Sequence, residues 1–464
     1  MRSLLPALIL VMLAMPAHAQ HWVTAWTAAA QGPYPSGNAT AQPDLRFALP
    51  SPDTGAKDQT FRLVLKPELW GPRVRVRFSN AFGTRPVTLD GAFLGLQSSG
   101  AAIMRASNRP VLFAGKKAVT LAPGAEAWSD PVALPFAGPA APELVGRKLA
   151  ASFHVAGETG PLTWHAKALQ TSYLTAPGAG SLGEREDEGA FPNSTTSWFL
   201  LDALDVQAPD AKLVVCFGDS ITDGTSSTLN GDDRWPDVLA RRLRTAGARM
   251  GVVNQGIGGN QVVGPAEYTP THPNPGGPSA LSRLDRDVLS LSGVTHVIWL
   301  EGINDFSTNG GAAGGGATLD QVQDGMKSGV ARLRAKLLGV KVIGATLTSI
   351  VGTTSTAHIP PEVEQKRQAF NEFVRHNDGL FDGFVDFDLA TADPATRAMR
   401  PEFIPGSTVG GPGDGLHPNR AGYLAMGNAV DLRLLVDPPK PVMHRPKPKP
   451  KPAAPVDADT DATN

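Results

Sequence analysis

The chain has 464 residues, and its 42 Lys and Arg against 43 Asp and Glu leave a formal net charge of −1. This length exceeds that of one typical hydrophobic core, so we expect two domains, and the balanced charge argues against a nucleic-acid-binding protein. The only cysteine, Cys216, excludes an intrachain disulfide and any zinc or iron–sulfur site that needs several thiolates. The 50 Gly and 41 Pro, about a fifth of the chain, predict long loops around an otherwise ordinary core.

Residues 1–19 are typical of a cleaved secretory signal peptide. Arg2 precedes an apolar run over residues 4–15, and the small residues Ala17 and Ala19 close the segment. A membrane anchor is the alternative, but the run is shorter than the roughly 20 apolar residues that a spanning helix needs. We therefore predict export to the periplasm or the medium, with no integral membrane segment after cleavage.

Residues 437–464 predict an extended tail. Proline alternates with lysine over residues 446–452, and Asp457, Asp459 and Asp461 follow. Because alternating proline permits neither a helix nor a strand ladder, we expect a Pro/Lys-rich disordered spacer. A solvated tail is the simpler interpretation, and a basic arm that contacts an anionic envelope surface or polysaccharide is the alternative.

Residues 20–208 have the alternation of β-strands. Over residues 73–78, Val74, Val76 and Phe78 share one face and three arginines share the other. Several such runs, separated by Gly/Pro turns and without a long helical stripe, predict half-buried strands in an antiparallel β-sandwich. Six tryptophans lie here, as core residues or, alternatively, as a platform for stacking sugars. The six are Trp22, Trp26, Trp70, Trp128, Trp164 and Trp198.

After residue 208, apolar runs alternate with amphipathic helical patterns. We expect strands over residues 213–217, 250–253, 295–300, 340–345 and 384–387. We expect helices that contain Trp235 and Leu281, one that starts at the capping box of Thr318 and Gln321, one over residues 362–377 and one after Pro418. Repeated βα units need a parallel sheet covered on both faces, and such sheets bind ligands beyond the carboxyl ends of their strands.

Residues capable of chemistry follow the predicted strands at that end of the sheet. The first strand leads into Gly218-Asp219-Ser220, the second into Gly258-Gly259-Asn260 and the third into Gly302-Ile303-Asn304-Asp305. The loop before the last helix reads Asp414-Gly415-Leu416-His417. Each motif alone is common, but four of them in this order at one end of a parallel sheet indicate an active site.

These motifs resemble the four blocks of the SGNH/GDSL hydrolases, with Ser220, Gly259, Asn304 and His417 as the block residues. The resemblance covers about residues 213–436 and implies a flavodoxin-like three-layer α/β/α SGNH hydrolase domain over residues 209–436. The preceding region resembles the N-terminal β domain of a secreted two-domain branch associated with arylesterases and acylhydrolases. This second resemblance does not identify the substrate.

The same residues support a serine esterase mechanism on physical grounds. A serine hydroxyl is a weak nucleophile at neutral pH, so Ser220 needs a base, and His417 can take its proton if an acceptor fixes the other ring nitrogen. Asp414, in the same loop, can provide that acceptor. The oxyanion formed on an ester carbonyl would be bound by the backbone N–H groups of Ser220 and Gly259 and by the side-chain amide of Asn304.

Other polar residues near these motifs are more simply explained by structure than by chemistry. The residues expected to hold loop amides or to be surface or satisfied histidines are Asp219, Asn254, Asp305, His165, His272 and His358. Cys216 is expected to be an inert buried thiol. Glu301 with Asp305 is no convincing metal pair, and no cluster has ligand spacing, so we predict neither a metal nor a cofactor.

Two long loops, residues 264–279 and 307–317, are expected to overhang the site. Neither has a strongly apolar amphipathic pattern, which favours a short-acyl esterase over a lipase for long chains. We therefore predict an exported serine esterase that removes short acyl, chiefly acetyl, groups from a small-molecule or polysaccharide ester. The alternatives are a broad arylesterase or lipase-like acylhydrolase and a non-catalytic carbohydrate-binding envelope protein, which the intact set of motifs disfavours.

Overall fold

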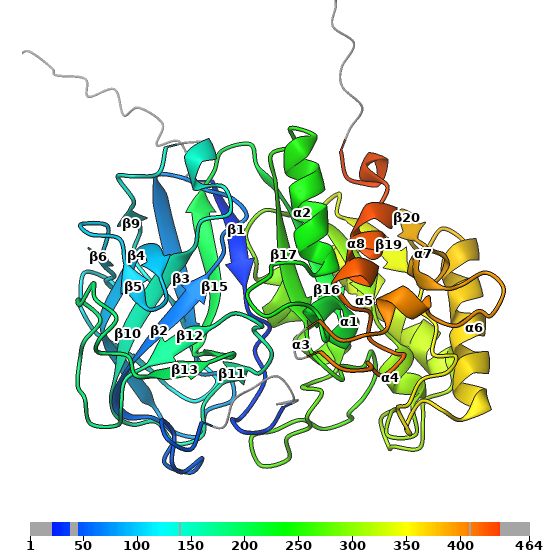
Figure 1. Cartoon of the computed structure of the whole chain (residues 1–464), viewed down its shortest axis with the longest axis horizontal. Coiled ribbons are helices and arrows are strands. Elements are labelled where there is room, and N and C mark those ends of the chain that lie inside the picture. Colours follow the sequence, from blue (N-terminus) through cyan, green and yellow to red (C-terminus); the bar gives the residue numbers. More distant parts are fainter. Residues whose placement is uncertain (1–20, 38–44, 139–140, 408–409, 437–464) are drawn as a thin grey trace, which may run out of the picture.

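A β-rich part and an α/β part make up the described chain (Figure 1). The computed structural model describes residues 21–37, 45–138, 141–407 and 410–436. The predicted signal peptide and the predicted tail lie outside these residues. Within the described ranges, no helix is both long and apolar enough to cross a membrane.

The β-rich part contains two large antiparallel sheets and one small sheet. The first has the strand order β1-β15-β3-β8, with β9 beside β3, and the second has the order β13-β12-β2-β10-β4-β5, with β6 and β7 beside β4. Strands β11 and β14 form the small sheet. The strands are β1 (Trp22–Thr27), β2 (Lys57–Leu65), β3 (Arg73–Ser79), β4 (Val87–Ser99), β5 (Ala102–Ile103), β6 (Arg109–Pro110), β7 (Val119–Leu121), β8 (Glu126–Trp128), β9 (Val132–Ala133), β10 (Leu149–Glu158), β11 (Trp164–His165), β12 (Ser172–Leu174), β13 (Asn193–Thr195), β14 (Trp198–Phe199) and β15 (Leu201–Gln207).

Aromatic side chains join the two large sheets. Phe78 on β3 meets Phe153 on β10 edge to face, with ring centroids 5.0 Å apart. Phe153 also stacks on Phe61 of β2 at 5.4 Å. Val74, Val76 and Phe78 are buried together, as the alternation of β3 predicted. The β-rich part therefore has a core into which both antiparallel sheets project side chains.

On the arginine face of β3, Arg73 is exposed and Arg75 is partly exposed, as expected for a half-buried strand, but Arg77 is not. Arg77 is only 3% exposed; its Nε donates to Asp202 over 2.8 Å, and its Nη1 donates to Ser290 of the α/β part over 2.6 Å. Arg62 on β2 is fully buried and donates to Ser152 and to the carbonyl of Ala101. Alternation in the sequence marks which face is polar, whereas burial depends on what the rest of the chain packs against that face.

The α/β part contains a parallel sheet with the strand order β17-β16-β18-β19-β20. Its strands are β16 (Lys212–Gly218), β17 (Met250–Gly256), β18 (Val294–Leu300), β19 (Lys341–Ala345) and β20 (Gly383–Val385). Gly218 pairs with Gly256 on one side and with Leu300 on the other, so β16, β17 and β18 end at the same level. Cys216 and Phe217, at adjacent positions of β16, point to opposite faces and are both fully buried, which shows that both faces of the sheet are covered.

Helices follow the strands, as predicted. They are α1 (Ser220–Asp223), α2 (Trp235–Thr245), α3 (Ala280–Leu284), α4 (Ile303–Phe306), α5 (Leu319–Lys336), α6 (Pro361–His376), α7 (Phe387–Thr391) and α8 (Arg420–Ala429). The capping box at Thr318 is present, because Thr318 Oγ1 accepts from the N–H of Gln321 over 3.2 Å and Gln321 Oε1 accepts from the N–H of Thr318 over 2.8 Å. The predicted strand over residues 384–387 is too long, because Asp386 caps α7 by accepting from Leu389.

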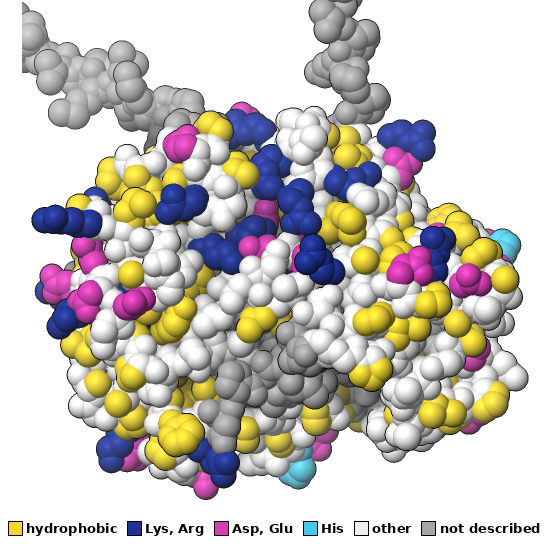
Figure 2. Space-filling model, viewed as in Figure 1, with side chains coloured by type: hydrophobic (Ala, Val, Ile, Leu, Met, Phe, Trp, Pro, Cys, Tyr) yellow, Lys and Arg dark blue, Asp and Glu magenta, His cyan; other side chains and the backbone are white. Residues whose placement is uncertain are grey.

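The two parts meet where β1 lies against β17. The N–H of Thr24 donates to the carbonyl of Ser292 over 3.0 Å, and the N–H of Ser292 donates to Thr24 Oγ1 over 3.0 Å. Figure 2 shows Lys and Arg side chains gathered in a band down the upper middle of this face, over the junction. Arg75, whose guanidinium bonds both Asp205 and Ser292, shows how polar groups connect the two parts.

Gly329 offers a test of how α5 packs on β18. A Cβ atom at this position would lie 2.4 Å from the ring of the fully buried Trp299. We predict that Gly329→Ala lowers the free energy of unfolding by about 1–3 kcal/mol, although alanine is the better helix former. Urea denaturation measures the change. Ser328→Ala, at the exposed neighbouring position of the same helix, is the matched control and is expected to leave stability unchanged or slightly higher. Equal stability of the two variants would contradict the described contact.

Candidate active site

Ser220 lies in a sharp turn at the carboxyl end of β16. The turn is fixed by Asp219, whose Oδ1 accepts from the N–H of Ile221 over 2.9 Å at the start of α1. This is the structural role expected for Asp219. Burial raises the pKa of the Asp219 carboxyl well above its ordinary value. The turn leaves Ser220 5% exposed, at the first position of the short helix α1.

Ser220, His417 and Asp414 are connected by hydrogen bonds. Ser220 Oγ lies 2.8 Å from His417 Nε2, and His417 Nδ1 lies 2.5 Å from Asp414 Oδ2. The other carboxylate oxygen of Asp414 accepts from the N–H groups of Leu416 and His417, over 2.9 and 2.8 Å. Residues 197 positions apart in the sequence thus meet at the carboxyl end of the sheet.

The charge of the Asp414 carboxylate fixes the direction of the two hydrogen bonds between Ser220, His417 and Asp414. Burial by itself would raise the pKa of Asp414, but the hydrogen bond from the His417 ring, the charge of that ring and two backbone N–H groups hold it well below its ordinary value. Since the Asp414 carboxylate only accepts, His417 Nδ1 donates to it. The Nε2 atom of the neutral ring is then free to accept the proton of the Ser220 hydroxyl.

The second and third predicted motifs lie beside this serine. Gly259 follows β17 with φ +83°, a conformation that glycine adopts without strain. The side-chain nitrogen of Asn304, in the short helix α4 that follows β18, donates to the carbonyl of Asn260 over 3.0 Å. Asn260 in turn donates to the carbonyls of Gly276 and Pro278, over 2.6 and 2.7 Å. Asn304 is therefore tied to the residue that follows Gly259, and that residue is tied to the loop over residues 264–279.

Both predicted overhanging loops are attached to the segment around Gly259. In the loop over residues 264–279, Gly276 accepts from Asn260, as described above. In the loop over residues 307–317, the N–H of Gly311 donates to Gln261 Oε1 over 2.9 Å. The β-rich part also holds the first loop, because Gln31 Nε2 donates to the carbonyl of Pro275 over 3.1 Å. The β-rich part thus contacts a loop beside the site.

Arg283 organises the segments around the site and was missed at the level of sequence. Its fully buried guanidinium donates to the carbonyl of Gly218, the carbonyl of Gln255 and Asn260 Oδ1, over 2.9, 2.8 and 2.7 Å. Asp287, four residues later, accepts from it over 2.9 Å. An Arg–Asp pair at helical spacing beside the apolar stripe of Leu284 was the available signal.

Other polar residues near the site have the structural roles expected of them. Asp305 accepts from the N–H groups of Val262 and Val263, over 2.8 and 2.9 Å. Asn254 Oδ1 accepts from the N–H of Gly256. Cys216 is buried, and burial raises the pKa of its thiol well above the ordinary value.

Three histidines that take no part in the hydrogen bonds between Ser220, His417 and Asp414 differ in their surroundings. His272 is exposed. His358 is buried, its Nδ1 lies 2.8 Å from Ser355 Oγ, and burial together with the charge of His417 lowers its pKa to about 4. His165 is buried between the carbonyl of Ala29 and the carboxylate of Asp223. The sequence did not indicate that His165 contacts the helix that carries Ser220.

The tryptophans of the β-rich part favour the core interpretation over a sugar platform. Trp26, Trp70, Trp164 and Trp198 are each no more than 6% exposed. Trp26 and Trp198 pack edge to face, with centroids 4.9 Å apart. The stacking platform is therefore wrong for these four residues, because their rings are enclosed by the protein.

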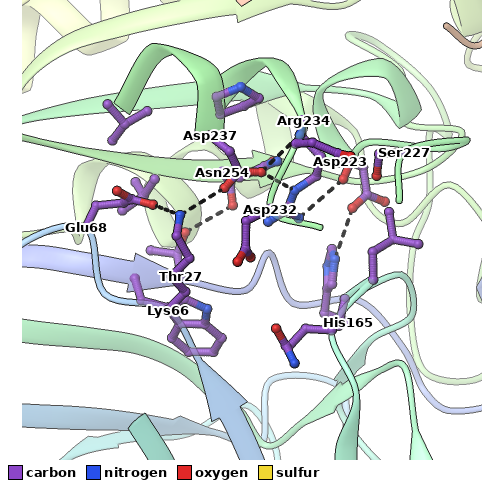
Figure 3. A pocket seen from close by; sticks show the side chains of 18 of the residues that line it. Thr27, Lys66, Glu68, His165, Asp223, Ser227, Asp232, Arg234, Asp237 and Asn254 are labelled. Carbon is purple, nitrogen blue, oxygen red and sulfur yellow. Dashed lines mark hydrogen bonds and ion pairs between the residues drawn. The ribbon is translucent and has the colours of Figure 1, made fainter. Parts of the chain in front are cut away.

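A small polar cavity lies where the two parts meet, close to the buried end of α1 (Figure 3). Its volume is about 40 Å³, room for one or two water molecules. Charged residues line it, among them Lys66, Glu68, Asp237 and Arg234. Lys66 pairs with Glu68 and lies 3.5 Å from Asp237, which also accepts from Arg234 over 2.9 Å. These charges compensate one another across the interface.

The family match of the α/β part supports a carboxylic ester hydrolase. Residues 216–425 match the family model described as the GDSL-like Lipase/Acylhydrolase family, and this match supports the SGNH/GDSL superfamily for this part of the chain. The resemblance to the SGNH/GDSL hydrolases is confirmed over these residues. No curated protein matches the chain.

Several solved structures are similar to about half of the chain. A carbohydrate acetylesterase family member from Sinorhizobium meliloti has 17% identity over 48% of this chain and 99% of that one, with a TM-score of 0.36. The native aryl esterase of M. smegmatis has 20% identity over 47% of this chain and 96% of that one, with a TM-score of 0.35. A GDSL-like lipase from Bacteroides thetaiotaomicron has 20% identity over 48% of this chain and 87% of that one, with a TM-score of 0.34.

Glu301, buried at the end of β18, predicts a pH effect on stability. Burial raises the pKa of its carboxyl to about 7, against the opposing influence of Arg283 and of the hydrogen bond from Trp299. The folded protein therefore holds a proton that the unfolded chain releases above about pH 4.5, and stability falls as the pH rises through 7. We expect Glu301→Gln, which keeps an acceptor for Trp299, to lose about 3 kcal/mol less than the wild type between pH 4.5 and 8.

Urea denaturation at the two pH values measures this difference. Glu402→Gln, at an exposed position, is the control and should follow the wild type. An identical pH dependence in wild type and Glu301→Gln would show that Glu301 does not titrate as described.

Proposed function

We propose that this chain is an exported serine esterase that hydrolyses short acyl esters, with Ser220 as nucleophile, His417 as general base and Asp414 as the residue that orients it. The observation that supports the proposal is the hydrogen-bond chain from Ser220 Oγ through His417 to Asp414. Nucleophile, base and orienting acceptor in this order are the arrangement that serine hydrolases share.

In the proposed reaction, Ser220 Oγ attacks the ester carbonyl carbon while His417 Nε2 takes the hydroxyl proton. The imidazolium that forms is stabilised by the Asp414 carboxylate. The carbonyl oxygen becomes an oxyanion, for which the N–H groups of Ser220 and Gly259 and the amide of Asn304 are the proposed donors. Collapse breaks the ester bond, His417 returns the proton to the leaving alkoxide, and a water molecule then hydrolyses the acyl-enzyme by the same route in reverse.

The loops beside the site favour a short acyl group. Residues 264–279 and 307–317 consist largely of Gly, Pro, Ala, Thr and Asn and offer little apolar surface to a long acyl chain. We further propose acetyl esters of carbohydrates as the natural substrates and the periplasm or medium as the location. The signal-like residues 1–19 support export.

Ser220→Ala tests the nucleophile. We expect the wild-type protein to hydrolyse p-nitrophenyl acetate with a burst of p-nitrophenolate, and the variant to lose at least 10³-fold in kcat, because no acyl-enzyme can form. Ser227→Ala, a buried serine in the loop after α1, is the matched control and should keep kcat. Equal rates for wild type and Ser220→Ala would refute the proposed function.

A panel of esters tests the substrate class. We expect kcat/KM for p-nitrophenyl esters to fall by about 10-fold or more from acetate to octanoate, since the site offers little apolar surface to bind the added carbons. Acetate release from acetylated xylan, from pectin and from acetylated peptidoglycan then identifies the natural ester. A preference for palmitate would instead indicate a lipase-like enzyme, and activity confined to aryl esters would indicate an arylesterase.

A further inference from the structure

Asp223 links the helix of the nucleophile to the segment that carries Gly259. It is the last residue of α1, three positions after Ser220, and it is 1% exposed. One carboxylate oxygen accepts from the N–H of Gly258 over 3.0 Å. The other lies 3.2 Å from His165 Nε2, a contact drawn in Figure 3. His165 belongs to β11 in the β-rich part, so this contact crosses between the two parts.

The ring of His165 is itself fixed in place. Its Nδ1 lies 2.9 Å from the carbonyl of Ala29, and the ring stacks on Trp198 with centroids 5.6 Å apart. Both ring nitrogens therefore face oxygen atoms that accept hydrogen bonds. A proton on Nε2 lets the ring donate a hydrogen bond to the Asp223 carboxylate, which only accepts.

The neighbouring chain supports the same contact. Lys167, two residues after His165, is buried and donates to Thr225 Oγ1 over 2.8 Å. The carbonyl of Leu169 accepts from the N–H of Asn230 over 2.8 Å. Residues 165–171 of the β-rich part thus lie along the loop that follows α1. Arg234 Nη1 donates to the backbone carbonyl of Asp223.

The hydrogen bond between Gly258 and Asp223 matters because Gly258 directly precedes Gly259. The peptide between Gly258 and Gly259 carries the N–H that the proposed mechanism aims at the oxyanion. Its direction depends on how the chain enters Gly259, where φ is +83°. The hydrogen bond from the Gly258 N–H to Asp223 fixes the preceding peptide, so a carboxylate that moved would also release the oxyanion segment.

We propose that His165 is a positioning residue for the oxyanion hole, which acts by holding the Asp223 carboxylate against the N–H of Gly258. The β-rich part thereby supplies a component of the active site rather than a separate module. This inference rests on the proposed function.

Kinetics of His165 and Asp223 variants test the inference on the full chain. His165→Phe keeps a flat ring beside Trp198 but leaves the Asp223 carboxylate without this partner. We expect kcat for p-nitrophenyl acetate to fall about 10- to 100-fold with KM nearly unchanged, a smaller loss than removal of an oxyanion donor causes. Affinity for a small boronic acid, which forms a tetrahedral anion on a reactive serine, should fall by the same factor as kcat.

Two substitutions at Asp223 separate positioning from charge. Asp223→Asn can still accept from Gly258, and its amide nitrogen can donate to the unprotonated Nε2 of a neutral His165, so we expect kcat within about threefold of the wild type. Asp223→Ala removes the acceptor and should lose as much as His165→Phe or more. The double variant His165→Phe with Asp223→Ala should be no slower than Asp223→Ala alone, because both act through one carboxylate.

Thr24→Val is the matched control, since Thr24 also joins the two parts but at the other end of the sheet. It should lower the melting temperature and leave kcat and boronic acid affinity unchanged. Wild-type kcat and affinity in His165→Phe, with Ser220→Ala inactive, would overturn this inference and leave the proposed function standing. An active Ser220→Ala would overturn the proposed function. If His165→Phe does not fold, the comparison of Asp223→Asn with Asp223→Ala takes its place. Equal kcat values of these two variants would also overturn the inference.

Discussion

A buried guanidinium sets the spacing of the segments that form the site. Arg283 donates to the carbonyls of Gly218 and Gln255, near the ends of two neighbouring parallel strands, and to the side chain of Asn260. A cation without access to water is tolerated only where acceptors surround it, and here Asp287 and the face of Phe217 complete the shell. Because these acceptors flank Ser220 and Gly259, this side chain helps to set the distance between the nucleophile and the oxyanion segment, together with the bond from Gly258 to Asp223.

The junction between the two parts is polar and close-fitting. Arginines on β3, the Thr24–Ser292 pair and the His165–Asp223 pair all connect the β-rich part to the α/β part. A junction of this kind fixes orientation as well as proximity, because each buried charge has a directed partner. The β-rich part therefore adds rigidity where the nucleophile helix and the loop after it would otherwise face solvent.

How far the sequence predicted the site depended on whether its parts are local. Asp414 and His417 share one loop, and the capping box at Thr318 lies within four residues. The sequence pattern therefore predicted both contacts, and the structure contains both. Arg283 and His165 could not be read in this way, since their partners lie in segments that only the folded sheet brings near. The strand after residue 383 was overextended for a related reason, because Asp386 starts a helix through a hydrogen bond that periodicity does not reveal.

The sequence by itself determined the order of β and α elements, the parallel sheet and the four motifs at its carboxyl end, because these follow from hydrophobic period and from residue types at strand ends. Only the tertiary structure decided which polar faces are buried, how the β-rich part meets the nucleophile helix and which side chains orient the groups that carry the chemistry. Those outcomes arise from contacts between residues more than fifty positions apart, which depend on how whole sheets pack rather than on any local pattern.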